Sequence, residues 1–201
     1  MLRVGLTGGL ASGKSFVGHA LEGMGCLLIL ADEIGHQVEQ PGGEAYQGIL
    51  HEFGPEILNS DGAVNRRLLG AMVFGKPERL EVLNALVHPP VRERIQKLLD
   101  DFAERQPDGI AVIEAAILVE TGSYRLYDRL IVAVCREEQQ IERAIERDHL
   151  TREEVLDRLR RQMPLEEKVK YADFVIDTSG TKQHTLDQTR AVHESLRRLN
   201  L

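Results

Sequence analysis

A glycine-rich stretch near the start of the chain has the residue types and spacing of a phosphate-binding loop. It reads Gly-Gly-Leu-Ala-Ser-Gly-Lys-Ser over residues 8–15 and fills the pattern G-x-x-x-x-G-K-[ST]. Gly8 and Gly13 allow backbone N–H groups to turn inward around the β-phosphate of a nucleotide. Lys14 is expected to reach the β- and γ-phosphates, and the Ser15 hydroxyl to bind the Mg²⁺ that bridges them. The alternative is a glycine-rich turn with a solvated lysine.

The neighbouring segments decide between these interpretations, because a phosphate-binding loop needs a strand before it and a helix after it. The apolar run over residues 4–6 suits the strand, and residues 16–24 carry apolar side chains at helical spacing. We therefore predict nucleotide binding. The residues expected to contact ATP here are Gly9, Leu10, Ala11, Ser12, Gly13, Lys14, Ser15 and Phe16.

Composition limits the class of protein. A chain of 201 residues, 42% of them hydrophobic, fits one domain with a sizeable core and room for a small inserted subdomain. No apolar run approaches the roughly 20 residues of a membrane span, and the chain enters a strand directly, so we expect a cytoplasmic protein. The net charge of −7 argues against a nucleic-acid surface. The expected partners are small-molecule substrates, with no nucleic acid, no membrane and a monomeric chain.

The two cysteines, Cys26 and Cys135, sit in apolar runs that we expect to form different strands. They lack the spacing of metal ligands, which favours buried thiols over a redox pair. Nothing in this pattern indicates an oxidising compartment.

Asp32 is a second residue that could take part in catalysis, after those of the phosphate loop. It follows the apolar run over residues 26–31, whose continuous character suits a strand buried on both faces. A carboxylate at the end of such a strand lies on the side where α/β folds place ligands. The alternative is that Asp32 caps a helix that starts at Glu33.

Residues 41–105 carry helical patterns and no strand pattern. Helices are expected over 44–53 and 65–74, and a longer one from 77 to about 103 with a bend at 88–90, where two prolines follow a histidine. A helical segment of this length between two strands predicts an inserted substrate-binding subdomain.

Strand patterns resume over residues 110–118, 130–135 and 174–176. With the first two strands they give five strands alternating with helices, which predicts an α/β fold: a five-stranded parallel sheet with helices on both faces and right-handed crossovers. The core of this single domain is expected to comprise residues 1–40, 106–136 and 172–201.

Between the last two strands, residues 137–171 form a segment dense in both charges, which we call the lid segment. Thr151 and Glu154 fit a capping box, and Arg143 and Arg147 share one helical face. A lid over phosphates needs two or three such arginines; the alternative is a solvated, salt-bridged helical hairpin. An amphipathic helix over 182–199 then closes the sheet.

Taken in order, these motifs resemble the dephospho-coenzyme A kinase family of P-loop kinases nearly end to end. The resemblance implies ATP- and Mg²⁺-dependent phosphorylation of the ribose 3′-hydroxyl of dephospho-coenzyme A, giving coenzyme A and ADP. The segments that carry it are residues 5–9, 13–15, 30–32, 41–42, 61–62 with Arg66, 86–89 with Arg92, 117–120, 140–148 with Arg158 and Gln162, and 172–177 with Gly180.

The resemblance also implies roles for individual residues. Asp32 would accept the proton of the substrate hydroxyl, with Lys14 and Arg143 as the other catalytic groups. Arg143 and Arg147 would cover the ATP phosphates. The residues that it places beside the acceptor are Thr7, Asp32, Arg66, His88 and Arg92, and those that it places beside the adenine are Thr178 and Gly180.

The chain departs from the family pattern at four positions. Family members usually carry glycine, aspartate, proline and asparagine where this chain has Ala11, Leu30, Ala116 and Thr178. Leu30 removes one of two expected carboxylates, whereas Asp32 is retained. Thr178 alters an expected adenine contact.

Two other functions fit parts of the sequence. Residues 32–35 have the D-x-x-G form of a GTP-driven switch, but the chain contains no Asn-Lys-x-Asp stretch that would bind guanine. Another small-molecule kinase of the same architecture, acting on a nucleoside or a shikimate-like alcohol, stays open on sequence chemistry alone.

Overall fold

The computed structural model describes residues 1–200, which form two compact units. One unit comprises residues 1–30 and the chain from residue 101 onward, and the other is Ala31–Asp100. The second unit begins ahead of the boundary expected at residue 41. The reason is that α2 (Ala31–Glu39) packs against α3 (Tyr46–Phe53), and the Ala45 N–H donates to the Val38 carbonyl at 3.0 Å.

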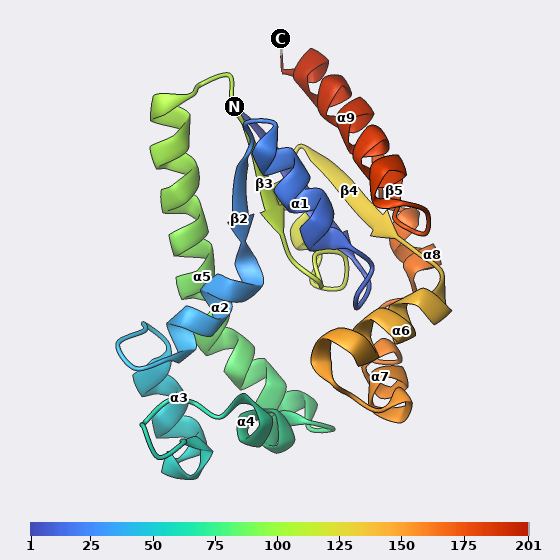
Figure 1. The fold of residues 1–201 in the computed structure, drawn as a ribbon. Coiled ribbons are helices and arrows are strands. Elements are labelled where there is room, and N and C mark those ends of the chain that lie inside the picture. The colour runs from blue at the N-terminus through green and yellow to red at the C-terminus, as the bar shows by residue number, and fades with distance from the viewer. Residues whose placement is uncertain (201) are drawn as a thin grey trace. The chain divides into compact units, whose positions relative to one another are not determined.

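The first unit contains the predicted five-stranded parallel sheet, in the order β2-β3-β1-β4-β5 (Figure 1). The strand order places β1 at the centre, where its residues from Val4 onward are buried. The strands are β1 (Leu2–Gly8), β2 (Leu27–Leu30), β3 (Ile110–Glu114), β4 (Arg129–Val134) and β5 (Phe174–Asp177).

The predicted end of the third strand is wrong. The strand expected over 110–118 ends at Glu114, which pairs with Leu6 of β1 and with Leu30, the last residue of β2. β2 ends at this level, and after one further bond, from the Ala115 N–H to the Leu6 carbonyl at 3.1 Å, the chain turns, with the Thr121 N–H donating to the Ile117 carbonyl at 3.1 Å.

The two cysteines lie just outside their strands, Cys26 before β2 and Cys135 after β4. Both are free; Cys26 is buried and Cys135 half-buried. Burial raises the pKa of the Cys26 thiol to about 11, and it also raises the pKa of Cys135. The expectation of a buried thiol is therefore confirmed for Cys26 and is wrong for Cys135, and the expectation that both cysteines lie within strands is wrong.

Helices α1 (Lys14–Gly23) and α9 (Lys182–Leu199) lie side by side against the sheet (Figure 1). The predicted closing helix over 182–199 is thus confirmed, whereas the first helix starts at Lys14 rather than residue 16. Both helices contribute to one apolar core with the strands. Its fully buried members include Val4, Leu6, Val17, Leu21, Val112, Ile131, Ile176 and Leu196.

The lid segment folds into α6 (Glu137–Asp148), α7 (Arg152–Leu159) and α8 (Leu165–Val169). The predicted capping box is present: the Thr151 hydroxyl accepts from the Glu154 N–H, and the Glu154 carboxylate accepts from the Thr151 N–H. A small apolar core of its own, formed by Ile141, Ala144 and Val155, holds α6 and α7 together.

The unit Ala31–Asp100 is helical, with α4 (Arg66–Val73) and most of α5 (Pro77–Arg105) following α2 and α3. Two short 3₁₀ turns, Pro55–Ile57 and Ser123–Leu126, complete the element order. Asn65 caps α4 by accepting from the Arg67 and Leu68 N–H groups, as its residue type favours. Helix α5 continues through Pro89 and Pro90, so the predicted long helix is confirmed.

Within residues 1–200, no helix combines the length and the apolar composition needed to cross a membrane.

Candidate active site

Residues 8–15 connect β1 to α1 in a closed loop whose geometry requires glycine at two positions. A Cβ atom on Gly8 would lie 2.4 Å from Ser12 Oγ and 2.5 Å from the Ala133 carbonyl oxygen. Gly13 has φ = 85°, in the left-handed region that favours glycine. The buried Ser12 hydroxyl has no hydrogen-bond partner among the described residues, so a bound anion can accept from it. This cradle fits a phosphate group.

Ala11 departs from the pattern of the loop. Its φ is 51°, so a residue with a Cβ occupies a conformation that L-residues adopt only at a cost of about 1 kcal/mol. The expected glycine at this position would relieve that strain. The Ala11 side chain instead packs against the apolar core of the lid segment.

The Ser15 hydroxyl donates to Glu114 Oε1 at 2.9 Å. Glu114 is 7% exposed and ends β3, beside both β1 and β2. Two hard oxygen ligands of this kind fit Mg²⁺. Sequence reasoning assigned Ser15 to the metal and gave no metal role to Glu114, its hydrogen-bond partner; the usable signal is a carboxylate at the end of a buried strand. Lys14 Nζ, which is expected to reach phosphate, donates to the Gly9 carbonyl at 3.2 Å.

Arg143 is joined to the phosphate loop through Thr178. Arg143 Nη1 donates to Thr178 Oγ1 at 3.1 Å, and Nη2 donates to the Thr178 carbonyl at 2.8 Å. The Thr178 hydroxyl donates in turn to the Ser12 carbonyl at 2.8 Å. The structure therefore brings together one predicted lid arginine, one predicted adenine-side residue and the loop. It also shows that threonine at 178 can serve as both acceptor and donor.

The other residues predicted for this unit are placed differently. Arg147 forms a bidentate ion pair with Asp148, at 2.7 and 2.9 Å, which holds the pKa of that carboxyl low. Among the hydrogen bonds within residues 1–200, none joins Arg147 to the loop. Phe16 is half-buried in the first turn of α1, and Gly180 is exposed just before α9. Thr7 is buried, and its hydroxyl donates to the Ala116 carbonyl at 3.2 Å.

Sequence reasoning missed a buried cation beneath the loop. The side chain of Lys168 is fully buried in α8. Its Nζ contacts Glu120 Oε1 at 2.8 Å, the Ala116 carbonyl at 2.8 Å and the Gly8 carbonyl at 3.3 Å. Three acceptors match the three protons of the ammonium group. This contact ties α8 to the first residue of the phosphate loop.

In the helical unit, Asp32 lies in the first turn of α2, which begins at Ala31. The alternative that Asp32 caps a helix starting at Glu33 is therefore wrong. The Asp32 side chain is exposed and forms no hydrogen bond within residues 1–200. It stands one helical turn before His36, on the same face of α2. This carboxylate is accessible to a proton donor.

Arg66, at the start of α4, is anchored to the same helix. Its guanidinium contacts His36 Nε2, and its Nε lies 3.4 Å from the buried carboxylate of Glu39. Burial is the largest cause of a lowered pKa at His36, and the charge of Arg66 lowers this pKa further. The neutral imidazole can therefore accept a hydrogen bond from the guanidinium. Burial raises the pKa of Glu39, and the charge of Arg66 opposes that change. Asp32 and Arg66, which are both predicted to lie beside the acceptor substrate, are thus positioned by α2.

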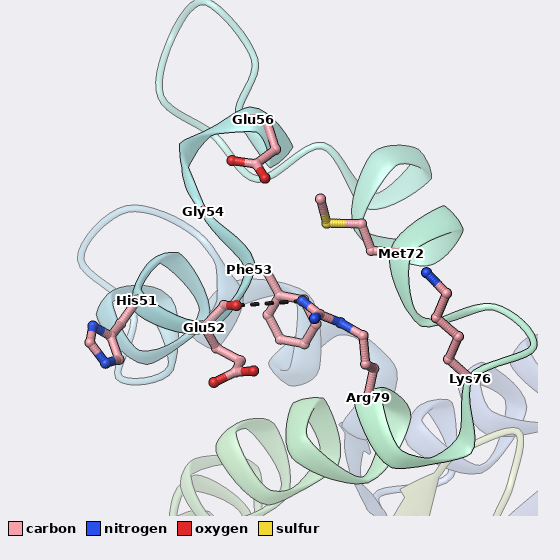
Figure 2. Close-up of a pocket in the computed structure, with 8 residues that line it drawn as sticks. All are labelled: His51, Glu52, Phe53, Gly54, Glu56, Met72, Lys76 and Arg79. Atoms are coloured by element: carbon pink, nitrogen blue, oxygen red, sulfur yellow. Dashed lines mark hydrogen bonds between the residues drawn. The ribbon is translucent and has the colours of Figure 1, made fainter.

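His88 and Arg92 lie one turn apart on α5, with Arg92 Nε 3.4 Å from the His88 carbonyl. Burial, and then Arg92, lower the pKa of His88. The same unit has a hollow of about 460 Å³ (Figure 2), where Arg79 lies 4.9 Å from the centre of the Phe53 ring. None of the predicted residues lines it; the lining residues are His51, Glu52, Phe53, Gly54, Glu56, Met72, Lys76 and Arg79.

Comparison with known proteins relates the chain to one enzyme family over nearly its whole length. The family model described as dephospho-CoA kinase matches residues 2–184. A dephospho-CoA kinase from Carboxydothermus hydrogenoformans is 43% identical over 185 residues, which cover 92% of this chain and 89% of that protein.

Solved structures agree with this result. A protein from Thermus thermophilus is 33% identical, with a TM-score of 0.82 and 97% of both chains covered. A dephospho-CoA kinase from Campylobacter jejuni is 25% identical, with a TM-score of 0.71 over 99% of this chain and 98% of that one.

Proposed function

We propose that this chain, which belongs to the dephospho-CoA kinase family, transfers the γ-phosphoryl group of ATP to the ribose 3′-hydroxyl of dephospho-CoA. The products are coenzyme A and ADP, so the reaction completes coenzyme A synthesis. The observation that carries the proposal is an intact phosphate loop, bonded to a lid arginine through Thr178, in a chain that matches the family from residue 2 to residue 184.

Phosphoryl transfer depends mostly on positioning and on neutralising charge. In the proposed mechanism the loop N–H groups and the Ser12 hydroxyl hold the phosphates, and Lys14 neutralises the β- and γ-phosphates. Arg143 stabilises the charge on the transferred group, with Arg147 beside it. Support comes from the half-buried position of Arg143 and its hydrogen bonds to Thr178.

Ser15 and Glu114 are the residues that would hold Mg²⁺. The ion, when bound, neutralises negative charge on the β- and γ-phosphates. The 2.9 Å hydrogen bond between the two side chains supports the assignment, because it brings two oxygen ligands together at the start of α1.

Asp32 is proposed to accept the proton of the ribose hydroxyl. The hydroxyl oxygen forms the new bond to the γ-phosphorus, the bond from that phosphorus to the β–γ bridging oxygen breaks, and the proton passes to the carboxylate. The exposed Asp32 side chain, which forms no hydrogen bond within residues 1–200, supports this role. Thr7, Arg66, His88 and Arg92 are the proposed contacts to the acceptor, and Thr178 and Gly180 those to the adenine.

A panel of acceptors tests the proposal. ADP formation would be followed with dephospho-CoA, a nucleoside, shikimate or no acceptor, and the product examined by phosphorus NMR. We expect ADP to form with dephospho-CoA only, together with a new phosphate monoester at the ribose 3′ position. Faster turnover with another alcohol would support a different small-molecule kinase. A rate that is the same with and without acceptors would support a nucleotide switch.

A further inference from the structure

Leu10, in the middle of the phosphate loop, is held from both sides by amide side chains of the lid segment. Its N–H donates to Gln162 Oε1 at 2.8 Å, and its carbonyl accepts from Gln140 Nε2 at 2.7 Å. Gln140 lies in the first turn of α6, and Gln162 follows α7. The two ends of the α6–α7 pair therefore meet at one residue of the loop.

Two further features fit this arrangement. A Cβ atom on Gly9 would lie 2.3 Å from Gln140 Nε2, so the glycine leaves the space that the amide occupies. The side chains of Leu10 and Ala11 pack against the apolar core of the lid segment, formed by Ile141, Ala144 and Val155. Two hydrogen bonds of Leu10 and the apolar packing of Leu10 and Ala11 thus join neighbouring residues of the loop to the lid segment.

The chemistry of the two side chains suits a structural contact beside a phosphate. Glutamine provides an acceptor for the Leu10 N–H and a donor for its carbonyl, yet carries no charge that would compete with an anion or a cation. Gln140 is 4% exposed, so little water can reach its amide group. If that amide were removed, the Leu10 carbonyl would be left without this hydrogen-bond donor.

We propose that Gln140 and Gln162 are positioning residues, which set the phosphate loop in its nucleotide-binding conformation and couple that conformation to the position of α6 and α7. This rests on the proposed function only in that the bound nucleotide is ATP or ADP. Neither side chain needs to touch the nucleotide, because each acts through Leu10. Movement of the lid segment then changes the geometry of the loop directly.

Replacement by methionine tests this, because methionine keeps the length of glutamine and removes the amide. The variants are Gln140→Met, Gln162→Met and the double variant. The matched control is Gln183→Met on α9, whose amide donates to Asp187 at 2.8 Å on the exposed surface. The affinity for a fluorescent ADP analogue with Mg²⁺ is measured by titration, and kcat and KM for ATP and dephospho-CoA are measured alongside a thermal melt.

We expect each single variant to bind the ADP analogue about tenfold more weakly, the usual scale for a hydrogen bond whose partner is left unsatisfied. The KM for dephospho-CoA should stay within about twofold of that of the control. The double variant should lose less than the product of the single effects, because both bonds act on one residue. Gln162 is half-buried, so Gln162→Met decides the matter alone if Gln140→Met does not fold.

The proposal is overturned if the folded single variants bind the analogue as tightly as Gln183→Met, or if the losses in the double variant simply multiply. A failure of the proposed function would look different. In that case the wild-type protein would not phosphorylate dephospho-CoA, while the binding titration, which contains no acceptor, would still report on the loop.

Discussion

The phosphate loop and the helical unit differ in how their predicted site residues are connected. Around the loop, hydrogen bonds link Arg143 to Thr178 and Thr178 to Ser12. In the helical unit, Arg66 is anchored to α2, whereas His88 and Arg92 contact each other on α5. A phosphate site made by consecutive backbone groups is determined by local sequence. A site made by long side chains on separate helices depends on how those helices pack.

If this contrast is correct, the largest effect should follow from removing the loop cation. Lys14→Ala should lower kcat by about 10³-fold or more, in the range found for a cation that stabilises a transferring phosphoryl group. The melting temperature should change little. Lys182→Ala, at the exposed start of α9, is the matched control and should behave as wild type in the same ADP-release assay. Near-normal turnover of Lys14→Ala would mean that the loop is only a structural turn.

Asp32→Asn tests the helical unit by the same assay. If Asp32 accepts the hydroxyl proton, kcat should fall by roughly 10²- to 10⁴-fold, the usual contribution of a positioned general base. A loose transition state could place the loss at the lower end, because the proton then leaves late. Since Asp32 is exposed and forms no hydrogen bond within residues 1–200, its substitution should leave the thermal melt unchanged. Unchanged turnover would instead direct attention to Glu114 or Glu120.

Arg143→Ala should lower kcat by about 10²-fold if the guanidinium stabilises charge in the transition state. The control is Arg160→Ala, whose side chain is 72% exposed and pairs with Asp157 at 2.9 Å. Because Arg143 also holds Thr178, a melt must accompany the kinetics. Equal small effects for the two variants would favour the salt-bridged hairpin over a lid that acts on phosphate.

Ala11→Gly should have the smallest effect of these variants, and it should improve a property of the protein, its stability, where the others lower its turnover. Removing the Cβ relieves the left-handed conformation at φ = 51°, and the free energy of unfolding should rise by about 1 kcal/mol in denaturant titrations. Ala20→Gly inside α1 is the control and should lower it by a similar amount, because glycine disfavours helix. A loss of stability in Ala11→Gly would mean that the contact of the methyl group with the lid core outweighs the strain.

Sequence patterns were sufficient for the features that depend on neighbours along the chain. The glycines of the loop, the strand before it and the capping box at Thr151 follow from local backbone requirements, and the structure contains each of them. The order of apolar runs was enough to predict five parallel strands. The strand ends were less accurate, because β3 ends level with the last residue of its neighbour β2 and not where its apolar run ends.

The contacts that sequence reasoning missed join residues far apart in the chain. Lys168 follows two glutamates and looks like an exposed residue, yet Glu120 and the Gly8 carbonyl satisfy it in the interior. Gln162 belongs to a motif of the family, but its residue type does not reveal its partner, because Leu10 lies 152 residues earlier in the chain. Such contacts are formed only when β1, α6 and α8 are assembled.

Separate binding of the two substrates tests the central claim most directly: that the loop unit holds ATP and the helical unit supplies most contacts to the acceptor. Calorimetric titrations would measure the affinities of Lys14→Ala and Arg92→Ala for Mg²⁺-ADP and for dephospho-CoA. We expect Lys14→Ala to bind Mg²⁺-ADP at least about tenfold more weakly than the wild type, because it loses a hydrogen bond to a charged group. Its affinity for dephospho-CoA should equal that of the wild type. Arg92→Ala should show the reverse. Weakening of the same ligand by both variants would contradict the account.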